Sequence, residues 1–476
     1  MTAVSVKHIF KGSSALAMSQ VVANLAAFVL AWSIARGLGS ASYGMFAAAY
    51  ALATSLAAMA DSGMRLALIR EIAREPLAWR RLARHGLLIS LLLGLLLSAA
   101  FMVLVVIREG MGESQVLRIW LLCFALIWVA LRISLGILAG RNLFVAVGLW
   151  GAIERVGGAS LVAYLAFFSE TTLVQLAQVL FVWESLVVLV LWIWLLSRGW
   201  ESDATKALPW TRFIRMSIPF GISAIIMTMI GRLDLVVLGF QQPPQDVAYY
   251  AAAQTLALLA LFASISLSSV LFPSLAKMAK DGSVERARTV IAPALGITTL
   301  LMLCMASILI AGSSVWLTWI YGDEFSEGAV WLVLFSLVSV FPAMGSMLGA
   351  VILAWGWQKR WAVLLLCSFA VAAPLYWLAG KGLGIWGVAA CSVLVQAVLM
   401  AVGWYWLVQK GLVEDAWWFV RLLLLLGISG GTVLLLGIGH PLVLLFPLML
   451  PVLAVVGGIC HLSWLRRAAN SLFSSQ

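Results

Sequence analysis

The chain has very little charge for its length. Only 10% of its 476 residues are Asp, Glu, Lys or Arg, whereas 64% are hydrophobic and the mean hydropathy is +1.07. A water-soluble protein of this size needs a charged surface, so the composition excludes a soluble globular enzyme. The longest polar stretches, at residues 65–85, 198–212 and 277–288, leave no room for a separate soluble catalytic domain.

Residue patterns that carry common enzyme chemistry are also missing. No GxxxxGK[ST] phosphate loop occurs, which argues against ATP use by this chain. The four histidines lack metal-ligand spacing and the five cysteines lie inside apolar stretches. The glycines between residues 380 and 387 follow an apolar helix rather than a strand, which indicates a turn and not a dinucleotide loop. We therefore expect no catalytic residue, no metal site, no disulfide and no cofactor.

Apolar stretches dominate what is present. About fourteen of them, each long enough to cross a bilayer, follow one another from Phe10 to Trp464. Because a spanning segment must satisfy its own backbone, they predict an all-α integral membrane protein with about fourteen transmembrane helices. The first stretch is too long for a secretory signal and has no convincing cleavage site. The expected helices are residues 14–36, 42–64, 86–107, 116–138, 143–168, 172–197, 213–239, 246–272, 289–311, 327–355, 361–379, 386–408, 417–438 and 442–464.

The basic residues predict the orientation. Lys and Arg outnumber Asp and Glu by 30 to 19, and they gather in alternate breaks between the apolar stretches. This is the pattern by which inner-membrane proteins encode topology, and it argues against nucleic-acid binding. Arg108 and Lys381 stand on the opposite, outer side. The sequence thus predicts a multi-pass protein of a bacterial inner membrane with both termini in the cytoplasm.

Two landmarks recur in the two halves of the chain. Gly39 precedes residues 45–49 (MFAAA), and Gly239 precedes residues 249–253 (YYAAA). Residues 138–141 likewise have a counterpart at 353–356. Both landmarks stand in register within their halves, which favours a repeat over a chance recurrence in an Ala-rich chain.

The repeat predicts two six-helix lobes in the same orientation. Parallel repeats in membrane proteins form two bundles around a shared cleft that holds the substrate. The predicted domains are residues 1–198 and 199–409 for the lobes, and residues 410–476 for two additional helices and a cytoplasmic tail.

Six phrases carry a resemblance to a known family. They are ARGLGSASYGMF (35–46), DSGMR (61–65), LIREIAR (68–74), LFPSLA (271–276), IYGDEF (320–325) and GLGIWGVA (382–389). Their order and spacing over residues 8–408 resemble those of polysaccharide-unit flippases, the O-antigen and exopolysaccharide translocases of the multidrug/oligosaccharidyl-lipid/polysaccharide superfamily.

The resemblance implies a fold and a substrate. The fold would be MATE-like, with two helical lobes. The substrate would be an undecaprenyl-diphosphate-linked oligosaccharide, moved without ATP from the cytoplasmic to the periplasmic leaflet for surface polysaccharides such as lipopolysaccharide. The implied partners are membrane lipids, a polysaccharide polymerase and chain-length proteins.

Charges inside the spans mark the candidate site, because such charges are costly and tend to face a water-filled interior or a partner. They are Arg36, Asp61, Arg132, Glu154, Arg155, Glu184, Arg232 and Asp234. A diphosphate needs cations in a low-dielectric cleft, and guanidinium matches phosphate geometry. The predicted substrate-binding residues are therefore Arg132, Arg155, Arg36 and Arg232. Arg36 and Arg232 also fit a snorkelling role at the outer interface, whereas Arg132 and Arg155 lie too deep for it.

The remaining charges are candidates for gating or ion coupling. These are Asp61, Arg65, Glu154, Glu184 and Asp234. Asp61 and Arg65 stand four residues apart and could pair at a helix end or act at the cytoplasmic mouth. Glu154 and Asp234 could instead pair with neighbouring arginines, and Glu184 could carry a coupling proton or sodium ion.

Three other functions stay open at this stage. A cation-coupled multidrug exporter of the same superfamily would have twelve helices and an acidic cleft. A peptidoglycan-precursor flippase would also have fourteen helices. A membrane glycosyltransferase or polymerase is disfavoured, because the outer breaks are short and lack its chemistry.

Overall fold

The computed structural model describes residues 6–109, 112–203, 209–259, 261–413 and 418–436, together with residues 451 and 454. These residues form α-helices and short 3-10 helices, and no strand occurs among them, which confirms the predicted all-α class. The predicted helix 442–464 lies outside the described residues, apart from those two positions. The elements are α1 (Val6–Asp61), α2 (Met64–Arg74), η1 (Pro76–Ala78), α3 (Trp79–Glu109), α4 (Glu113–Gly140), α5 (Phe144–Phe168), α6 (Leu173–Ser197), α7 (Trp210–Ile230), α8 (Leu233–Gln241), α9 (Pro244–Leu259), α10 (Phe262–Lys280), α11 (Val284–Ala311), α12 (Ser313–Tyr321), η3 (Asp323–Gly328), α13 (Ala329–Val338), α14 (Val340–Ala354), α15 (Gln358–Gln409) and α16 (Trp418–Leu436).

Two of these helices are too long for one crossing. α1 has 56 residues and α15 has 52, so each would extend roughly 80 Å, more than twice the hydrocarbon thickness. Each contains one non-helical glycine, Gly39 with φ 82° and Gly384 with φ 61°. A positive φ is open to glycine at little cost, so the chain turns there and starts a second span. These turns lie in the breaks expected between residues 36 and 42 and between residues 379 and 386.

The structure contains many membrane spans. Among the described residues, eight helices are long and apolar enough to cross a membrane, or nine when one bent pair is counted as a span. α1 and α15 are two of the eight, and each folds as two segments. The bent pair is α7 with α8, which meet at an angle of 47° where the sequence analysis expects one helix, residues 213–239. The helix stops at Gly231 and Arg232, and Arg232 has a non-helical backbone with φ −131° and ψ −7°.

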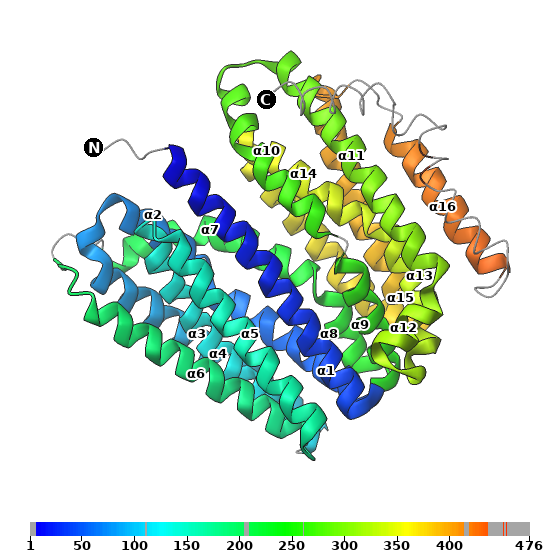
Figure 1. Cartoon of the computed structure of the whole chain (residues 1–476), viewed down its shortest axis with the longest axis horizontal. Coiled ribbons are helices and arrows are strands. Elements are labelled where there is room, and N and C mark those ends of the chain that lie inside the picture. The colour runs from blue at the N-terminus through cyan, green and yellow to red at the C-terminus, as the bar shows by residue number, and fades with distance from the viewer. Residues whose placement is uncertain are drawn as a thin grey trace. The chain divides into compact units, whose positions relative to one another are not determined.

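Helix packing divides the chain into two compact units, Met1–Ala248 and Tyr249–Gln476. In the first unit, α4 packs against α1, α2, α3, α5 and α6, and is therefore its central helix (Figure 1). α7 and α8 also belong to this unit, where they pack on α1. The first unit thus extends past residue 198, where the sequence analysis ends the first lobe. The division at 198 and 409 stays a prediction.

The second unit has its own core. α10, α11, α13, α14 and α15 pack around buried residues such as Met344, Met347 and Leu348. α16 packs against α13 and buries Leu422, while Leu424 and Ile428 are exposed (Figure 1). Within this unit α16 has one packed face, as expected for a helix that faces lipid on its other side.

The end of the first unit that we expect in the cytoplasm is fastened by a cation–π contact. The Arg141 guanidinium lies 4.0 Å from the centroid of the Trp200 ring and donates a hydrogen bond to the Pro76 carbonyl at 3.0 Å. Burial lowers the pKa of the Arg141 guanidinium from its ordinary value. Trp200 also meets the buried Trp79 ring edge-on. This contact fixes the segment that follows α6 onto η1 and the start of α3.

Candidate functional site

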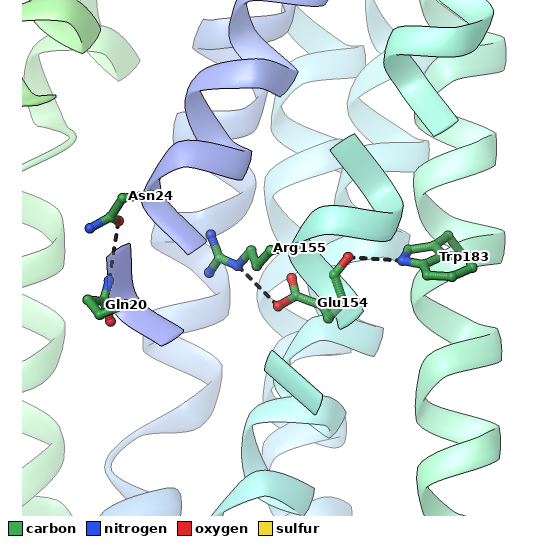
Figure 2. A network of polar contacts seen from close by, with 5 residues as sticks. All are labelled: Gln20, Asn24, Glu154, Arg155 and Trp183. Carbon is green, nitrogen blue, oxygen red and sulfur yellow. Dashed lines mark hydrogen bonds and ion pairs between the residues drawn. The ribbon is translucent and has the colours of Figure 1, made fainter. Parts of the chain in front are cut away.

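The centre of the first unit contains an ion pair on α5. Arg155 Nε donates to Glu154 Oε2 at 3.1 Å, and Glu154 is buried (Figure 2). The indole N–H of Trp183 on α6 donates to the backbone carbonyl of Glu154 at 2.9 Å. Figure 2 shows the Arg155 side chain extending to the side on which Gln20 and Asn24 of α1 hydrogen-bond to each other at 3.2 Å. The guanidinium therefore points away from α6, and its remaining N–H groups face α1.

α6 is held in register by its first turn. Thr172 accepts a hydrogen bond from the Gln175 backbone amide, and the Gln175 side chain accepts one from the Thr172 amide. This capping box satisfies two backbone donors and fixes where the helix begins. Glu184 and Trp183 then follow three turns later, facing α5.

A tryptophan links the two predicted arginines. The guanidinium carbon of Arg132 on α4 lies 5.2 Å from the centroid of the Trp128 ring, and that of Arg155 lies 5.8 Å from the same centroid. The two carbons are therefore no more than about 11 Å apart. Each cation is attracted to the ring, so one indole keeps two like charges near each other. The structure thus brings Arg132 and Arg155 together, which the sequence analysis could only propose.

A small cavity lies behind the ion pair. Its volume is about 30 Å³, enough for a water molecule, and its wall includes Tyr50, Glu154, Arg155 and Glu184. The Glu184 side chain is 1% exposed, and its Oε1 atom has no hydrogen-bond partner. A buried carboxylate oxygen without a donor is costly unless it binds a proton or a cation.

Other charged residues extend the site. Arg132 interacts electrostatically with Asp61, Arg65, Glu154 and Arg155. Tyr50 interacts in the same way with Arg155, Arg232, Glu154 and Glu184. Seven predicted site residues therefore lie within electrostatic range of Arg132 or Tyr50, Arg132 itself included. They are Asp61, Arg65, Arg132, Glu154, Arg155, Glu184 and Arg232.

Asp61 and Arg65 lie where α1 turns into α2. The Arg65 backbone amide donates to Asp61 Oδ1 at 3.1 Å, across the left-handed residues Ser62 and Gly63. The contact runs through the backbone amide of Arg65, whereas the sequence analysis expected a pair of side chains; the guanidinium lies within electrostatic range of Asp61 and Arg132. The end of α1 at Asp61 lies close to the predicted helix end at residue 64, but a separate helix in residues 64–74 was not predicted. α2 forms because residues 64, 67, 68 and 72 give it a buried face.

Two predicted residues lie elsewhere. Arg36 is exposed on α1, one residue before Gly37, which packs on Ala166. Ala166 is twelve residues after Glu154 on α5, so Arg36 lies roughly 18 Å along that helix from the ion pair. Asp234 is buried in the first turn of α8, and its Oδ1 accepts the Leu235 amide at 2.8 Å, where the helix dipole favours an anion. Their roles in substrate binding or coupling stay predictions.

The Trp183 indole fits α5 because of two glycines. A Cβ at Gly157 would overlap the Trp183 ring, and one at Gly158 would come within 3.3 Å of it. Gly157→Ala is therefore expected to destabilise the protein by about 1–3 kcal/mol, because the ring must leave its place on α5. Thermal unfolding in detergent measures this. Gly151→Ala is the matched control on the same helix, since nothing lies within 4 Å of its Cβ. Equal unfolding temperatures for both variants would contradict the packing argument.

The sequence analysis missed three residues of the site. Trp128 stands four residues before Arg132, so the two share a helix face, and this spacing was a usable signal. Tyr50 and Trp183 had no local signal, because they meet α5 only through the packing of α1 and α6.

Comparison with known structures defines the class. An inward-facing multidrug resistance MATE family transporter of the MOP superfamily aligns with a TM-score of 0.64 at 20% identity, covering 81% of this chain and 93% of that chain. The eukaryotic MATE transporter AtDTX14 gives 0.58 at 19%, covering 83% and 94%. A MOP superfamily transporter from Pyrococcus furiosus gives 0.58 at 19%, covering 84% and 94%. The protein therefore has the two-lobed MATE-like fold of multi-pass membrane transporters.

The family follows from the sequence. The model of the polysaccharide biosynthesis protein family matches residues 9–279, more than half of the chain. The chain belongs to this family, which confirms the flippase-family resemblance of its sequence phrases. No curated protein matches the chain.

Proposed function

We propose that the protein flips a polyprenyl-diphosphate-linked oligosaccharide from the cytoplasmic to the periplasmic leaflet of a bacterial inner membrane, by alternating access without ATP. The family supports a role in polysaccharide biosynthesis, and the fold supports transport. The single observation that supports this substrate class is that two deep guanidinium groups, those of Arg132 and Arg155, lie near one Trp128 ring.

The pair suits a diphosphate for electrostatic reasons. Two phosphates carry adjacent negative charges, and each can accept two parallel hydrogen bonds from one guanidinium. In a low-dielectric bundle these bonds replace water that the head group loses when it leaves the membrane surface. Glu154 accepts a single hydrogen bond from Arg155, the one donated by Nε, so it neutralises only part of the guanidinium charge.

A multidrug exporter is the runner-up, because several structural neighbours are MATE transporters. An exporter of cationic drugs needs a cleft dominated by carboxylates. In this chain, the charged residues within electrostatic range of Arg132 and Tyr50, with Arg132 itself, are four arginines and three carboxylates. The Pyrococcus furiosus transporter of the same fold has been described as having a binding pocket of reversed polarity that suggests a different function. We therefore favour an anionic substrate, while a peptidoglycan precursor remains the alternative diphosphate lipid.

Glu184 is the proposed site of ion coupling. Its Oε1 atom has no donor, it faces a cavity large enough for a water molecule, and Glu154 and Arg155 stand beside it. One proton or sodium ion would neutralise the second carboxylate of this group. Movement of that ion down its gradient would supply the driving force that ATP does not.

A deletion strain tests the proposed function. A flippase mutant is expected to accumulate the completed lipid-linked oligosaccharide in the inner leaflet, detected by lipid extraction and mass spectrometry. Complementation with the wild-type chain should remove it. Loss of drug resistance with normal glycan lipids would favour the exporter, and an early-terminated glycan would favour a transferase.

The orientation is tested by cysteine labelling at exposed positions. Cysteine at Ser314 or Ser326 is expected to react with a reagent that cannot cross the membrane, and cysteine at Ala73 is expected to react only after lysis. All three positions are exposed, so the side of the membrane on which each one lies decides whether the reagent reaches it. Labelling of position 73 in intact cells would overturn the prediction that both termini are cytoplasmic.

A further inference from the structure

A second cavity lies in the first unit, at the opposite end of α4 from Arg65. Its volume is about 380 Å³, within the range of small-molecule sites. Its wall is apolar over Met45, Ala48 and Leu52 of α1, and polar at Ser114 and Arg118 of α4. Among the described residues that line it, Arg118 has the only formal charge. An apolar wall beside one cation fits an amphiphilic anion.

The Arg118 side chain is positioned by packing. Its guanidinium carbon lies 5.3 Å from the centroid of the Phe240 ring. The centroids of the Phe240 and Phe101 rings are 6.1 Å apart. An aromatic face therefore holds the cation at the cavity wall. A guanidinium has five N–H donors in one plane, so a group held in this way can bind several acceptor oxygens at once.

Close backbone contacts shape the cavity. A Cβ at Gly44 would overlap the Pro244 carbonyl, and one at Gly239 would overlap the Ala48 side chain. α1 therefore approaches the turn between α8 and α9 directly, and the two glycines set the spacing between them. The cavity is the space left between these contacts and the N-terminal turns of α4.

Arg118 and Arg132 share one face of α4. They are fourteen residues apart, which is almost four turns, so the two side chains lie within about 40° of each other and roughly 21 Å apart along the helix. Arg132 is near the α2 end of α4, since Gly136 packs on Arg65. Arg118 is near the other end, which the basic residues predict to be periplasmic.

We propose that the Arg118 cavity is an outer anion site, which receives the diphosphate ester and the first part of its apolar chain after Arg132 and Arg155 release them. This rests on the proposed function for its substrate class. Two cationic stations on one helix face divide the crossing into two shorter steps, so the head group exchanges one guanidinium for the next instead of passing through lipid unpaired.

The test uses protection of a cysteine in the cavity. Met45 lines it and is 37% exposed. In a chain whose five native cysteines are replaced by alanine, Met45→Cys is labelled with a water-soluble maleimide in neutral-lipid nanodiscs. Farnesyl diphosphate is expected to slow the labelling about tenfold, the effect of one charge-assisted contact. Arg118→Gln is expected to remove this protection, and Arg118→Lys to keep part of it because the charge remains.

The controls separate charge, lipid and function. Lys381→Gln removes another exposed cation expected on the outer side, and should leave protection within about twofold of the parent, as for an independent surface charge. Protection that persists in Arg118→Gln overturns the proposal. So does equal protection by phosphatidylglycerol nanodiscs without farnesyl diphosphate, which would make the cavity a phospholipid site.

Variants of the deep arginines Arg132 and Arg155 distinguish failure of the outer site from failure of the proposed function. In the triple variant Arg132→Gln, Glu154→Gln and Arg155→Gln, which removes the buried carboxylate together with its partner, protection of position 45 is expected to persist while export is lost. If export persists in that variant and Arg118 still controls protection, the outer site stands and the proposed function fails. If export is lost but Arg118→Gln changes neither protection nor export, the proposed function stands and the outer site is refuted.

Discussion

Alanine at Arg132 or at Arg155 is expected to abolish surface glycan display while the protein remains in the membrane. Each substitution removes one of the two guanidinium groups on Trp128, and the diphosphate would then lose a bidentate partner in a low-dielectric site. Arg→Lys is expected to restore display only in part, because ammonium keeps the charge but not the planar fork. Display is measured by glycan labelling at the cell surface and divided by the amount of protein in the membrane.

A structural role for Arg155 must be separated from a binding role. Arg155→Ala alone leaves the buried Glu154 without its partner, which costs about 3–5 kcal/mol and could lower the protein level. The double variant Glu154→Gln with Arg155→Gln removes both charges, and we expect it to be stable and still inactive. Arg36→Lys is the surface control and should display normally, since lysine also reaches the interface. Full display with alanine at both deep positions would remove them from the mechanism.

Glu184→Gln is expected to uncouple transport from the ion gradient. Glutamine keeps the shape of the side chain but takes neither a proton nor a sodium ion in its place. In proteoliposomes loaded with a fluorescent polyprenyl-diphosphate lipid, an imposed pH or sodium gradient should accelerate flipping at least about tenfold for the wild type and have no effect on the variant. The matched control is Glu170→Gln, an exposed carboxylate in the turn before α6.

The outcome also identifies the ion. A response to a pH gradient in sodium-free buffer indicates a proton, and a response to sodium at constant pH indicates sodium. If Glu184→Gln responds to either gradient as the wild type does, the orphan oxygen of Glu184 has no part in coupling, and its burial has to be explained as a packing feature.

Long-range packing explains which site residues could be predicted. Arg132, Glu154, Arg155 and Glu184 were evident because a charge in an apolar stretch is visible without any structure. Trp128 could have been found from its spacing to Arg132. Tyr50 and Trp183 could not, because each meets α5 from a different helix, α1 and α6 respectively, and helical spacing within one helix does not show such a contact.

The backbone bends likewise differ in whether the sequence alone could predict them. Glycine at positions 39 and 384 permits the turns inside α1 and α15, and the predicted breaks fall there. The 47° bend between α7 and α8 also has a glycine, Gly231, and the charges Arg232 and Asp234 follow it, but the sequence analysis places one helix, residues 213–239, across it. After the bend α8 packs against α1, where Gly239 meets Ala48, and this contact between helices far apart in the sequence is visible only in the structure.

The sequence by itself determined the membrane class, the all-α fold class and the family, because the bilayer leaves helices as the way for an apolar chain to satisfy its backbone, and family phrases are local. It also determined which charges are too deep to be surface residues. Only the tertiary structure decided that Arg132 and Arg155 share an indole, that Glu184 lacks a donor, and that Arg118 faces a cavity. The physical reason is that hydropathy and helical period act within one helix, whereas ion pairs, stacking and cavities depend on how helices pack against each other.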